Sequence, residues 1–519
     1  MNTEKLKKYL KIINEFVLRF GFVFEFIFSI IMAIAVYKVI MYKTYYEHFS
    51  YKNMILIVVS VIIILYIAIL NIVKNKKKYE KIFLHLMIPI GSLFLILMIP
   101  GFVADEPAHI YRAYDISRGI LIQPIDENGK SSSSIPKDFN LNHRDTFSNY
   151  KTLNDKFKEQ TDYNETEELY NPAQGYNPIM YLFSSIAFLI GRVCGMNSFL
   201  VIYMARIFNF ILFLFLGYYA IKIIPLGKFL LLVYFFNPMM ISQATSVSAD
   251  SIINSIVIFF IAFVLHLYFQ EKEMTKVQKI IFVINAIAVS LAKYVYFPVI
   301  FISLILLKSK AIGEKKNRKL IYITIAVTLL LAVASYWIGS QYENLGAYAK
   351  EHYVNSTEQI KNIITNPIRY IGTIFTTLAE FGEYYFYGFA GKYLGWINIL
   401  VNSVPIIIYG FLLLMTPMIE KNNKALKRKD KIICNVVFLV VFILVLTGMY
   451  LINSEVESNI IEGVQGRYFI PIILLPLITF IMKNKYMNYS ERNVLILYIL
   501  FIFFIDGSAL NAMCKFFTV

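Results

Sequence analysis

Residues 54–73, MILIVVSVIIILYIAILNIV, contain twenty residues without a single charge. A helix of that length covers about 30 Å, which is the thickness of the hydrocarbon core of a bilayer. Apolar runs of this kind recur along almost the whole chain. They do not alternate between apolar and polar residues, as the strands of a transmembrane barrel would. The sequence therefore predicts an all-α polytopic membrane protein.

The composition supports a protein whose main solvent is lipid. Of 519 residues, 58% are hydrophobic and 16% are charged, whereas a soluble domain has about 45–50% and about 25%. The net charge of +16 comes from short Lys and Arg clusters between apolar runs, where topology signals are expected, so we expect no nucleic-acid partner. The three cysteines, Cys194, Cys434 and Cys514, lie too far apart for a zinc motif or a disulfide framework.

We expect about 13 transmembrane helices. Basic clusters at residues 5–11, 74–81, 308–319 and 421–431 all fall on one side of the membrane if the N-terminus is cytoplasmic. The predicted spans are 16–42, 54–73, 82–103, 200–222, 227–243, 250–269, 278–291, 294–307, 319–340, 397–418, 431–453, 467–483 and 493–512.

The segment 176–195, YNPIMYLFSSIAFLIGRVCG, is the ambiguous one, because counting it as a span would move two basic clusters outside. Its apolar part is short, with Pro178 near the start and Arg192 near the end, which favours an interfacial or re-entrant helix. Whether it crosses the membrane stays open.

This topology divides the chain into a two-helix N-terminal addition, residues 1–80, and a transmembrane core, residues 81–519. The core places a large loop, residues 104–176, and a second polar segment, residues 341–396, on the extracytoplasmic face. We expect the loop to be a partly ordered subdomain with a mobile tip at residues 131–134. The site should lie on this face, because the cytoplasmic loops carry no Gly-rich nucleotide motif.

The third predicted span ends in PGFVADEPAHIYRAYDISRG, residues 100–119, and places Asp105 and Glu106 at the membrane rim. A carboxylate there can act as a general base on an acceptor hydroxyl, and apolar walls would raise its pKa toward the working pH. Asp105 is the first candidate for the catalytic residue and Glu106 the second. The alternative is that Asp105 caps a helix over residues 106–117.

Further polar residues of that helix share a face with Glu106. His109 and Arg112 follow at intervals of three residues, and both are candidates for substrate binding. Asp105, Glu106 and His109 also form an incomplete metal motif, which would suit a hard divalent cation, Mg or Mn, better than zinc. The sequence indicates no other cofactor.

Two cations stand where a phosphate group would lie. In EGVQGRYFIPIILLP, Gln465, Arg467 and Tyr468 precede a late span, and Arg467 can hold a phosphate with a fork of donors. The alternative for Arg467 is snorkelling to the interface. Lys293, in LAKYVYFP, lies away from the cytoplasmic basic clusters and invites an anionic partner, either a substrate phosphate or a structural carboxylate.

A run of polar residues interrupts the middle of the chain. The segment FFNPMMISQATSVSADSIINS, residues 235–255, places Gln243 and Asp250 in apolar surroundings, where polar groups need partners or water. The functional interpretation is a substrate-binding cavity wall. The alternative is helix capping by Ser248 or Asp250.

The same motifs carry a family resemblance. DEPAHIYRAYDISRG, NPMMISQATSVSAD, LAKYVYFP and GVQGRYFIP, in this order over about residues 80–515, resemble the bacterial membrane family called domain of unknown function 2142. That family resembles the GT-C glycosyltransferases, which use polyprenyl-phosphate sugars and carry an acidic pair in their first large extracytoplasmic loop. The resemblance implies that Asp105 is the catalytic acidic residue, with Glu106 beside it. It gives no role to His109, Lys293 or Arg467.

The resemblance and the residues together imply a multi-pass enzyme of the bacterial cytoplasmic membrane with an extracytoplasmic active site. We expect it to transfer a sugar from a polyprenyl-phosphate donor, with inversion, to a cell-surface glycan, lipid or teichoic-type acceptor. A polymerase or ligase of lipid-linked glycans would use similar residues. A transporter or flippase of lipid-linked sugars is the alternative from another class, and such proteins usually show internal repeats and midplane charges.

Overall fold

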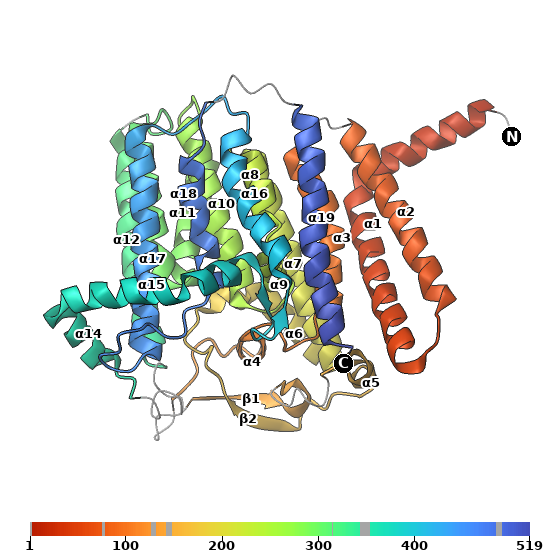
Figure 1. Cartoon of the computed structure of the whole chain (residues 1–519), viewed down its shortest axis with the longest axis horizontal. Helices are drawn as coiled ribbons and strands as arrows, with labels where there is room; N and C mark the ends of the chain where they lie inside the picture. The colour runs from red at the N-terminus through yellow and green to blue at the C-terminus, as the bar shows by residue number, and fades with distance from the viewer. Residues whose placement is uncertain are drawn as a thin grey trace.

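A bundle of long helices forms the body of the protein (Figure 1). The computed structural model describes residues 3–74, 78–125, 131–141, 148–313, 315–342, 353–483 and 490–518. Within these ranges, eight helices are long and apolar enough to cross a membrane. They are α1 (Thr3–Tyr46, apolar from Arg19), α2 (Tyr51–Lys74), α3 (Tyr79–Leu97), α7 (Ser198–Ile223), α10 (Ala249–Phe269), α12 (Lys315–Ser340), α17 (Arg428–Asn453) and α19 (Glu491–Phe516).

The expected all-helical membrane protein is confirmed, but the count of 13 spans is not. Other predicted spans correspond to shorter helices, among them α11 (Lys276–Ala292), α16 (Ser403–Ile419) and η4 (Tyr294–Lys308). The last is a 3₁₀ helix of 15 residues. With a rise of about 2.0 Å per residue, it reaches about 30 Å, so it is long enough to cross a membrane with few residues.

The predicted span 227–243 is broken into two helices, α8 (Lys228–Phe235) and α9 (Pro238–Ala244). Asn237 starts the second helix, since its side chain accepts a hydrogen bond from the N–H of Met240 at 3.1 Å. Pro238 has no N–H to continue the first helix. The predicted span 467–483 likewise divides into η5 (Gly466–Phe469) and α18 (Ile470–Thr479).

The ambiguous segment 176–195 forms η3 (Pro178–Tyr181) and α6 (Leu182–Val193), which pack against α4 and α7. Its outer face is apolar and exposed, as at Phe183, Ile186 and Val193. An exposed apolar face on a short helix is typical of contact with lipid at the membrane boundary.

The large loop folds into a small subdomain below the bundle (Figure 1). Its elements are α4 (Glu106–Ser117), β1 (Ser132–Pro136), η1 (Lys137–Phe139), α5 (Tyr150–Lys156) and β2 (Thr166–Tyr170). The two strands are antiparallel, with Ser132 opposite Tyr170. The expected mobile tip at residues 131–134 is therefore wrong. Ser133 is buried and donates a hydrogen bond of 2.5 Å to Oδ2 of Asp115. This bond attaches the serine run to α4.

The second polar segment contains α14 (Ser356–Thr365) and α15 (Pro367–Ala390), and α15 lies across the bundle (Figure 1). A short hairpin follows α15; its strands, β3 (Tyr393–Leu394) and β4 (Ile399–Leu400), have two residues each. The predicted span 397–418 therefore starts later than expected, at Ser403, where the Asn402 side chain accepts from the N–H of Val404 at 3.0 Å.

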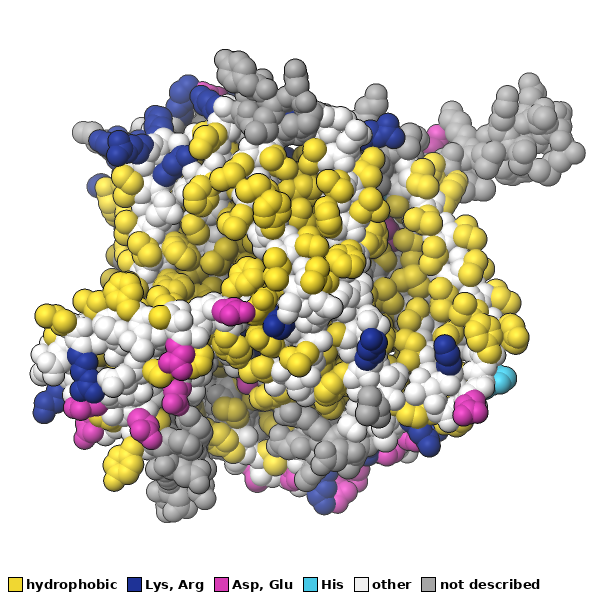
Figure 2. All heavy atoms as spheres, in the orientation of Figure 1, with side chains coloured by type: hydrophobic (Ala, Val, Ile, Leu, Met, Phe, Trp, Pro, Cys, Tyr) yellow, Lys and Arg dark blue, Asp and Glu magenta, His cyan; other side chains and the backbone are white. Residues whose placement is uncertain are grey.

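The types of side chain on the surface change along the length of the helix bundle. Figure 2 shows apolar side chains across the flanks of the bundle, Lys and Arg along the upper edge, and Asp and Glu mainly near the lower edge. The helices α1 and α2 lie at one side of the bundle. Helix α1 packs on α3, where the buried His85 Nδ1 is 2.7 Å from Oε2 of Glu25. The surface is that of a membrane protein whose two ends differ in charge.

Candidate active site

Asp105 lies at the start of α4 in a left-handed conformation, with φ 63° and ψ 0°. Its side chain makes no capping hydrogen bond to the helix. The carboxylate instead pairs with Nη2 of Arg467, whose Nη1 donates to the carbonyl of Ala104 at 3.2 Å. Asp105 therefore occupies the N-cap position, as the alternative predicted, but its carboxylate does not cap the helix and is engaged in an ion pair.

This ion pair decides the charge state of Asp105. Burial raises the pKa of the carboxyl, but the positive charges of Arg467 and Lys293 stabilise the anion, and the net pKa lies below its ordinary value. The expectation of a raised pKa was wrong because it considered only the apolar walls. Asp105 is consequently a carboxylate at neutral pH, with a side chain that is 46% exposed.

Arg467 is buried, with only 4% of its side chain exposed, so it does not snorkel to the interface. Its Nε lies 3.8 Å from Oδ2 of Asp250. Asp250 accepts a hydrogen bond from Gln243 at 2.9 Å, and Gln243 accepts one from Asn254 at 2.9 Å. Asp250, which Gln243 holds in place, thus stabilises Arg467. The guanidinium lies next to two carboxylates, those of Asp105 and Asp250.

The capping prediction for α10 holds at the other end of this segment. The hydroxyl of Ser248 accepts from the N–H of Asp250 at 3.1 Å. This cap leaves the Asp250 carboxylate free to pair with Arg467, so capping and site support coexist here.

A cavity of about 380 Å³ opens beside Asp105. Its walls come from α4, the segment before η3, the junction of α11 and η4, the end of α12, the middle and end of α17, and η5. The predicted site residues on its walls are Asp105, His109, Lys293 and Tyr468. Residues that are far apart in sequence therefore meet around one space whose volume lies in the range of small-molecule sites.

Lys293 has aromatic neighbours in this cavity. Its Nζ lies 4.8 Å from the ring centre of Tyr468 and 5.6 Å from that of Tyr176. Within the residues that the structure describes, no carboxylate oxygen is within 4.0 Å of Nζ, so the structural ion pair is not formed there. A cation held by two aromatic rings without a contacting anion is suited to bind an anionic group.

His109 is neutral in this setting, because burial lowers its pKa to about 4. Its Nδ1 is 2.7 Å from the hydroxyl of Tyr181, and its ring packs edge-on against Tyr176 at 5.3 Å. His109 can therefore orient a hydroxyl group by hydrogen bonding, but it supplies no positive charge at neutral pH.

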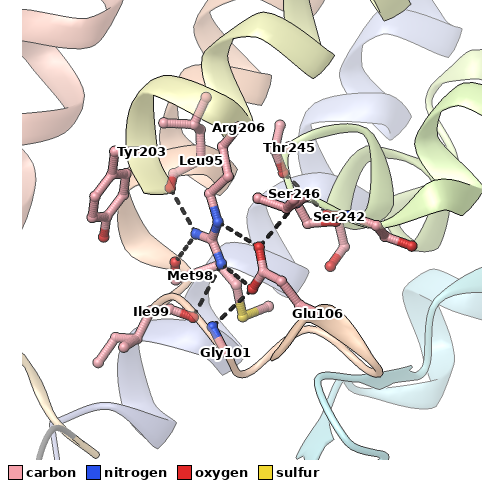
Figure 3. Close-up of polar contacts among 12 residues, drawn as sticks. Leu95, Met98, Ile99, Gly101, Glu106, Tyr203, Arg206, Ser242, Thr245 and Ser246 are labelled. Carbon is pink, nitrogen blue, oxygen red and sulfur yellow. Dashed lines mark hydrogen bonds and ion pairs between the residues drawn. The ribbon is translucent and has the colours of Figure 1, made fainter. Parts of the chain in front are cut away.

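Glu106 points away from the cavity, into a fully buried ion pair with Arg206 (Figure 3). Arg206 donates to both carboxylate oxygens, at 2.7 and 2.5 Å. The amides of Gly101 and Val247 also donate to them, at 2.8 and 3.0 Å. Arg206 further donates to carbonyls of the chain after α3, including that of Met98 at 2.5 Å. The four bonds saturate the carboxylate, and Glu106 acts as a structural clamp in this conformation.

The directions of the Asp105 and Glu106 side chains are incompatible with the suggested metal site. In the described part of the chain, no group of three His, Cys, Asp or Glu side chains could hold a metal ion. Glu106 faces Arg206 while Asp105 faces Arg467, so the three residues Asp105, Glu106 and His109 do not converge. The residues present do not fit a divalent cation held by this motif.

Two predicted binding residues, Arg112 and Gln465, belong neither to the wall of this cavity nor to the group of Gln243, Asp250 and Arg467 beside it. Arg112 donates through Nη2 to the carbonyls of Leu121, at 2.6 Å, and Tyr176, at 3.3 Å. Gln465 precedes η5 and does not contribute to the cavity wall.

Sequence reasoning missed three residues that organise the site: Tyr176, Tyr181 and Arg206. The tyrosines had no distinguishing pattern among the 38 of the chain. Arg206 did carry a signal, because a charge within a predicted span implies an opposite charge near it. Glu106, at the end of a predicted span, was a candidate for that opposite charge.

Comparison with known proteins adds one result. A family model described as "Predicted membrane protein (DUF2142)" matches residues 86–476, which contain every predicted site residue. No curated protein and no solved structure matches the chain.

Proposed function

The chain belongs to the DUF2142 family of predicted membrane proteins, and from that premise we propose that it is a glycosyltransferase. Its donor is a polyprenyl-phosphate sugar, and its acceptor is a hydroxyl of a cell-surface glycan, lipid or teichoic-type polymer. The proposal goes beyond the family description, which names no activity.

One observation carries the proposal: an ionised carboxylate, Asp105, and a cation without a contacting anion, Lys293, line the same cavity. Transfer from a phosphate donor needs a base for the acceptor and a positive charge for the leaving phosphate. The two groups come from distant parts of the chain, and Arg467 keeps the base ionised.

In the proposed reaction, the acceptor oxygen forms a bond to the anomeric carbon as the bond from that carbon to the phosphate oxygen breaks. Asp105 takes the acceptor proton, and polyprenyl phosphate leaves with the bonding electrons next to Lys293. Attack from the side opposite the phosphate inverts the anomeric centre. Tyr176 and Tyr468, which flank Lys293, offer ring faces to the sugar.

The arrangement of charges supports an extracytoplasmic site. The predicted cytoplasmic clusters at residues 74–81, 308–319 and 421–431 flank the ends of α2, α12 and α17 that are opposite to the loop subdomain. By the positive-inside rule, we expect the end with Asp105 to face away from the cytoplasm.

Asp105→Asn in nanodiscs with a polyprenyl-phosphate hexose tests the proposal. The amide keeps the shape of the side chain, so folding should change little, while removing a general base should lower kcat roughly 10²–10⁴-fold. Asp155→Asn, which changes an exposed carboxylate of the same subdomain, is the matched control. Undiminished transfer by folded Asp105→Asn, or no transfer by the wild-type protein with any such donor, would refute the proposal.

A further inference from the structure

A second, smaller cavity of about 230 Å³ adjoins the first. The two cavities share part of their walls, which comes from the short segment before η3 and from the end of α12 with the residues just after it. The shared residues are Gly175, Tyr176, Asn177, Ser335 and Tyr342. A ligand in the second cavity is therefore separated from the Asp105 cavity by no more than this common wall.

Arg112 lines the second cavity, although only 2% of the residue is exposed. Its bonds go to backbone carbonyls, those of Leu121 and Tyr176 and, at 3.5 Å, that of Ile120. Among the residues that the structure describes, no carboxylate oxygen lies within 4.0 Å of the guanidinium, and its Nε has no acceptor. Asp115, three residues further along α4, interacts with the guanidinium electrostatically but makes no ion pair within 4.0 Å, and a buried cation without a contacting anion is costly.

A neighbouring side chain repeats this pattern. Gln174 lines the same cavity, is 3% exposed, and has an amide nitrogen Nε2 without an acceptor in the described chain. Two residues in the wall of this cavity thus carry a buried donor without an acceptor, and one of these donors belongs to a cation. Buried donors normally have partners, so this cavity is suited to a ligand with negatively charged oxygen atoms.

We propose that the second cavity is the acceptor subsite and that Arg112 binds an anionic group of the acceptor. This rests on the proposed glycosyltransferase function. It adds the chemical class of the acceptor, which is a glycan or polyol that carries a phosphate or carboxylate close to the hydroxyl that receives the sugar.

The spacing along α4 sets the distance between the two groups. Asp105 and Arg112 are seven residues apart on one helix, which corresponds to about 10 Å along its axis. That distance spans one to two repeats of a polyol phosphate or about two linked sugar rings. An acceptor with its anionic group at Arg112 would thus present a hydroxyl near Asp105.

The experiment measures binding without turnover, in nanodiscs of phosphatidylcholine that contribute no net lipid charge. Isothermal titration compares oligo(glycerol phosphate) with an uncharged oligoglycerol of equal length. We expect the charged oligomer to bind the wild-type protein at least tenfold more tightly. Arg112→Gln should weaken its binding roughly ten- to hundredfold, and Arg112→Lys should restore most of it.

Arg118→Gln is the matched control, because Arg118 also donates to a backbone carbonyl, that of Ser134, but lines neither cavity. Its affinity for the charged oligomer should equal that of the wild type. If Arg112→Gln does not fold, Gln174→Leu replaces it, since this change removes an unsatisfied donor. It should weaken binding of the charged oligomer severalfold.

Equal binding of both oligomers to the wild type, or wild-type affinity in folded Arg112→Gln, would overturn the acceptor subsite. The two proposals fail separately. Charge-selective binding that depends on Arg112, with no sugar transfer, would refute the enzyme and keep the site. Transfer that depends on Asp105 and ignores the charge of the acceptor would refute the subsite alone.

Discussion

Glu106→Gln should destabilise the protein without removing its chemistry. The wild-type carboxylate accepts four hydrogen bonds in a fully buried ion pair. In the variant, the carboxamide keeps only one acceptor oxygen. Its NH₂ group replaces the other oxygen, so the N–H groups that donated to that oxygen lose their acceptor. Arg206 then stays buried without a counterion.

The magnitude follows from that geometry. Removing one partner of a buried ion pair costs about 3–5 kcal/mol. Arg206 keeps its carbonyl partners at Leu95, Met98 and Ile99, so the lower end of that range applies, about 3 kcal/mol. Because both charges are lost together, the double variant Glu106→Leu with Arg206→Leu should be less destabilised than the sum of the two single variants, by about 2 kcal/mol.

Equilibrium unfolding by SDS in mixed micelles measures these free energies, with sugar transfer recorded for each folded fraction. Glu165→Gln, which breaks an exposed pair with Lys137, is the control and should unfold like the wild type. Additive single variants, or a Glu106→Gln protein as stable as the wild type, would contradict the clamp. A stable protein as inactive as Asp105→Asn would instead place Glu106 in the reaction.

Three further predictions concern the site and its orientation. Arg467→Gln removes the main charge that holds the pKa of Asp105 below its ordinary value, so this pKa should rise. Because Asp105 acts as the anion, the variant should lose activity at a higher pH than the wild type as the solution is made more acidic. An unchanged acidic limb in the pH profile of kcat/KM would contradict this. Lys293→Gln should raise the KM for the donor roughly tenfold or more with little change in stability, and an unaltered donor KM would exclude phosphate binding there. In intact cells of a Cys194→Ser background, an impermeant thiol reagent should label Asn164→Cys and spare Asn423→Cys, both at exposed positions; the reverse pattern would invert the topology.

The sequence was sufficient for the long spans because each is set by local composition. Residues 54–73 and 250–269 have enough apolar residues to span the membrane whatever they pack against, and both are helices over nearly the predicted range. The predicted helix 106–117 was also correct in its bounds. Local signals such as Pro107 near its start are sufficient there.

Breaks inside apolar segments are set by single residues, such as Pro238, and not by composition. The run 227–243 has the composition of one span, yet the Asn237 side chain replaces a backbone bond and starts a new helix. Whether an asparagine does this depends on its partners, and here its amide also donates to the carbonyl of Phe389 at 2.9 Å. That contact joins residues 152 positions apart, which no local pattern reports.

The candidate site was predictable as a set of residues but not as a set of roles. Asp105, Lys293 and Arg467 were selected because charges at the membrane rim are costly unless they are used or paired. Sequence could not decide which charges pair with one another. The structure pairs Arg467 with Asp105 and Glu106 with Arg206, so that two neighbouring carboxylates receive different tasks.

The Glu106 clamp also has a mechanical consequence. Its carboxylate joins the chain after α3 to Arg206 of α7 and to the amide of Val247, three residues before Asp250. Helices tilt when the lipid hydrocarbon becomes thinner or thicker. The Glu106 bonds hold the end of α3, α7 and the start of α10 together at the level of the site, in addition to the packing of these helices on one another. We therefore expect a change in lipid chain length to displace the far ends of these helices more than the two carboxylates around Arg467.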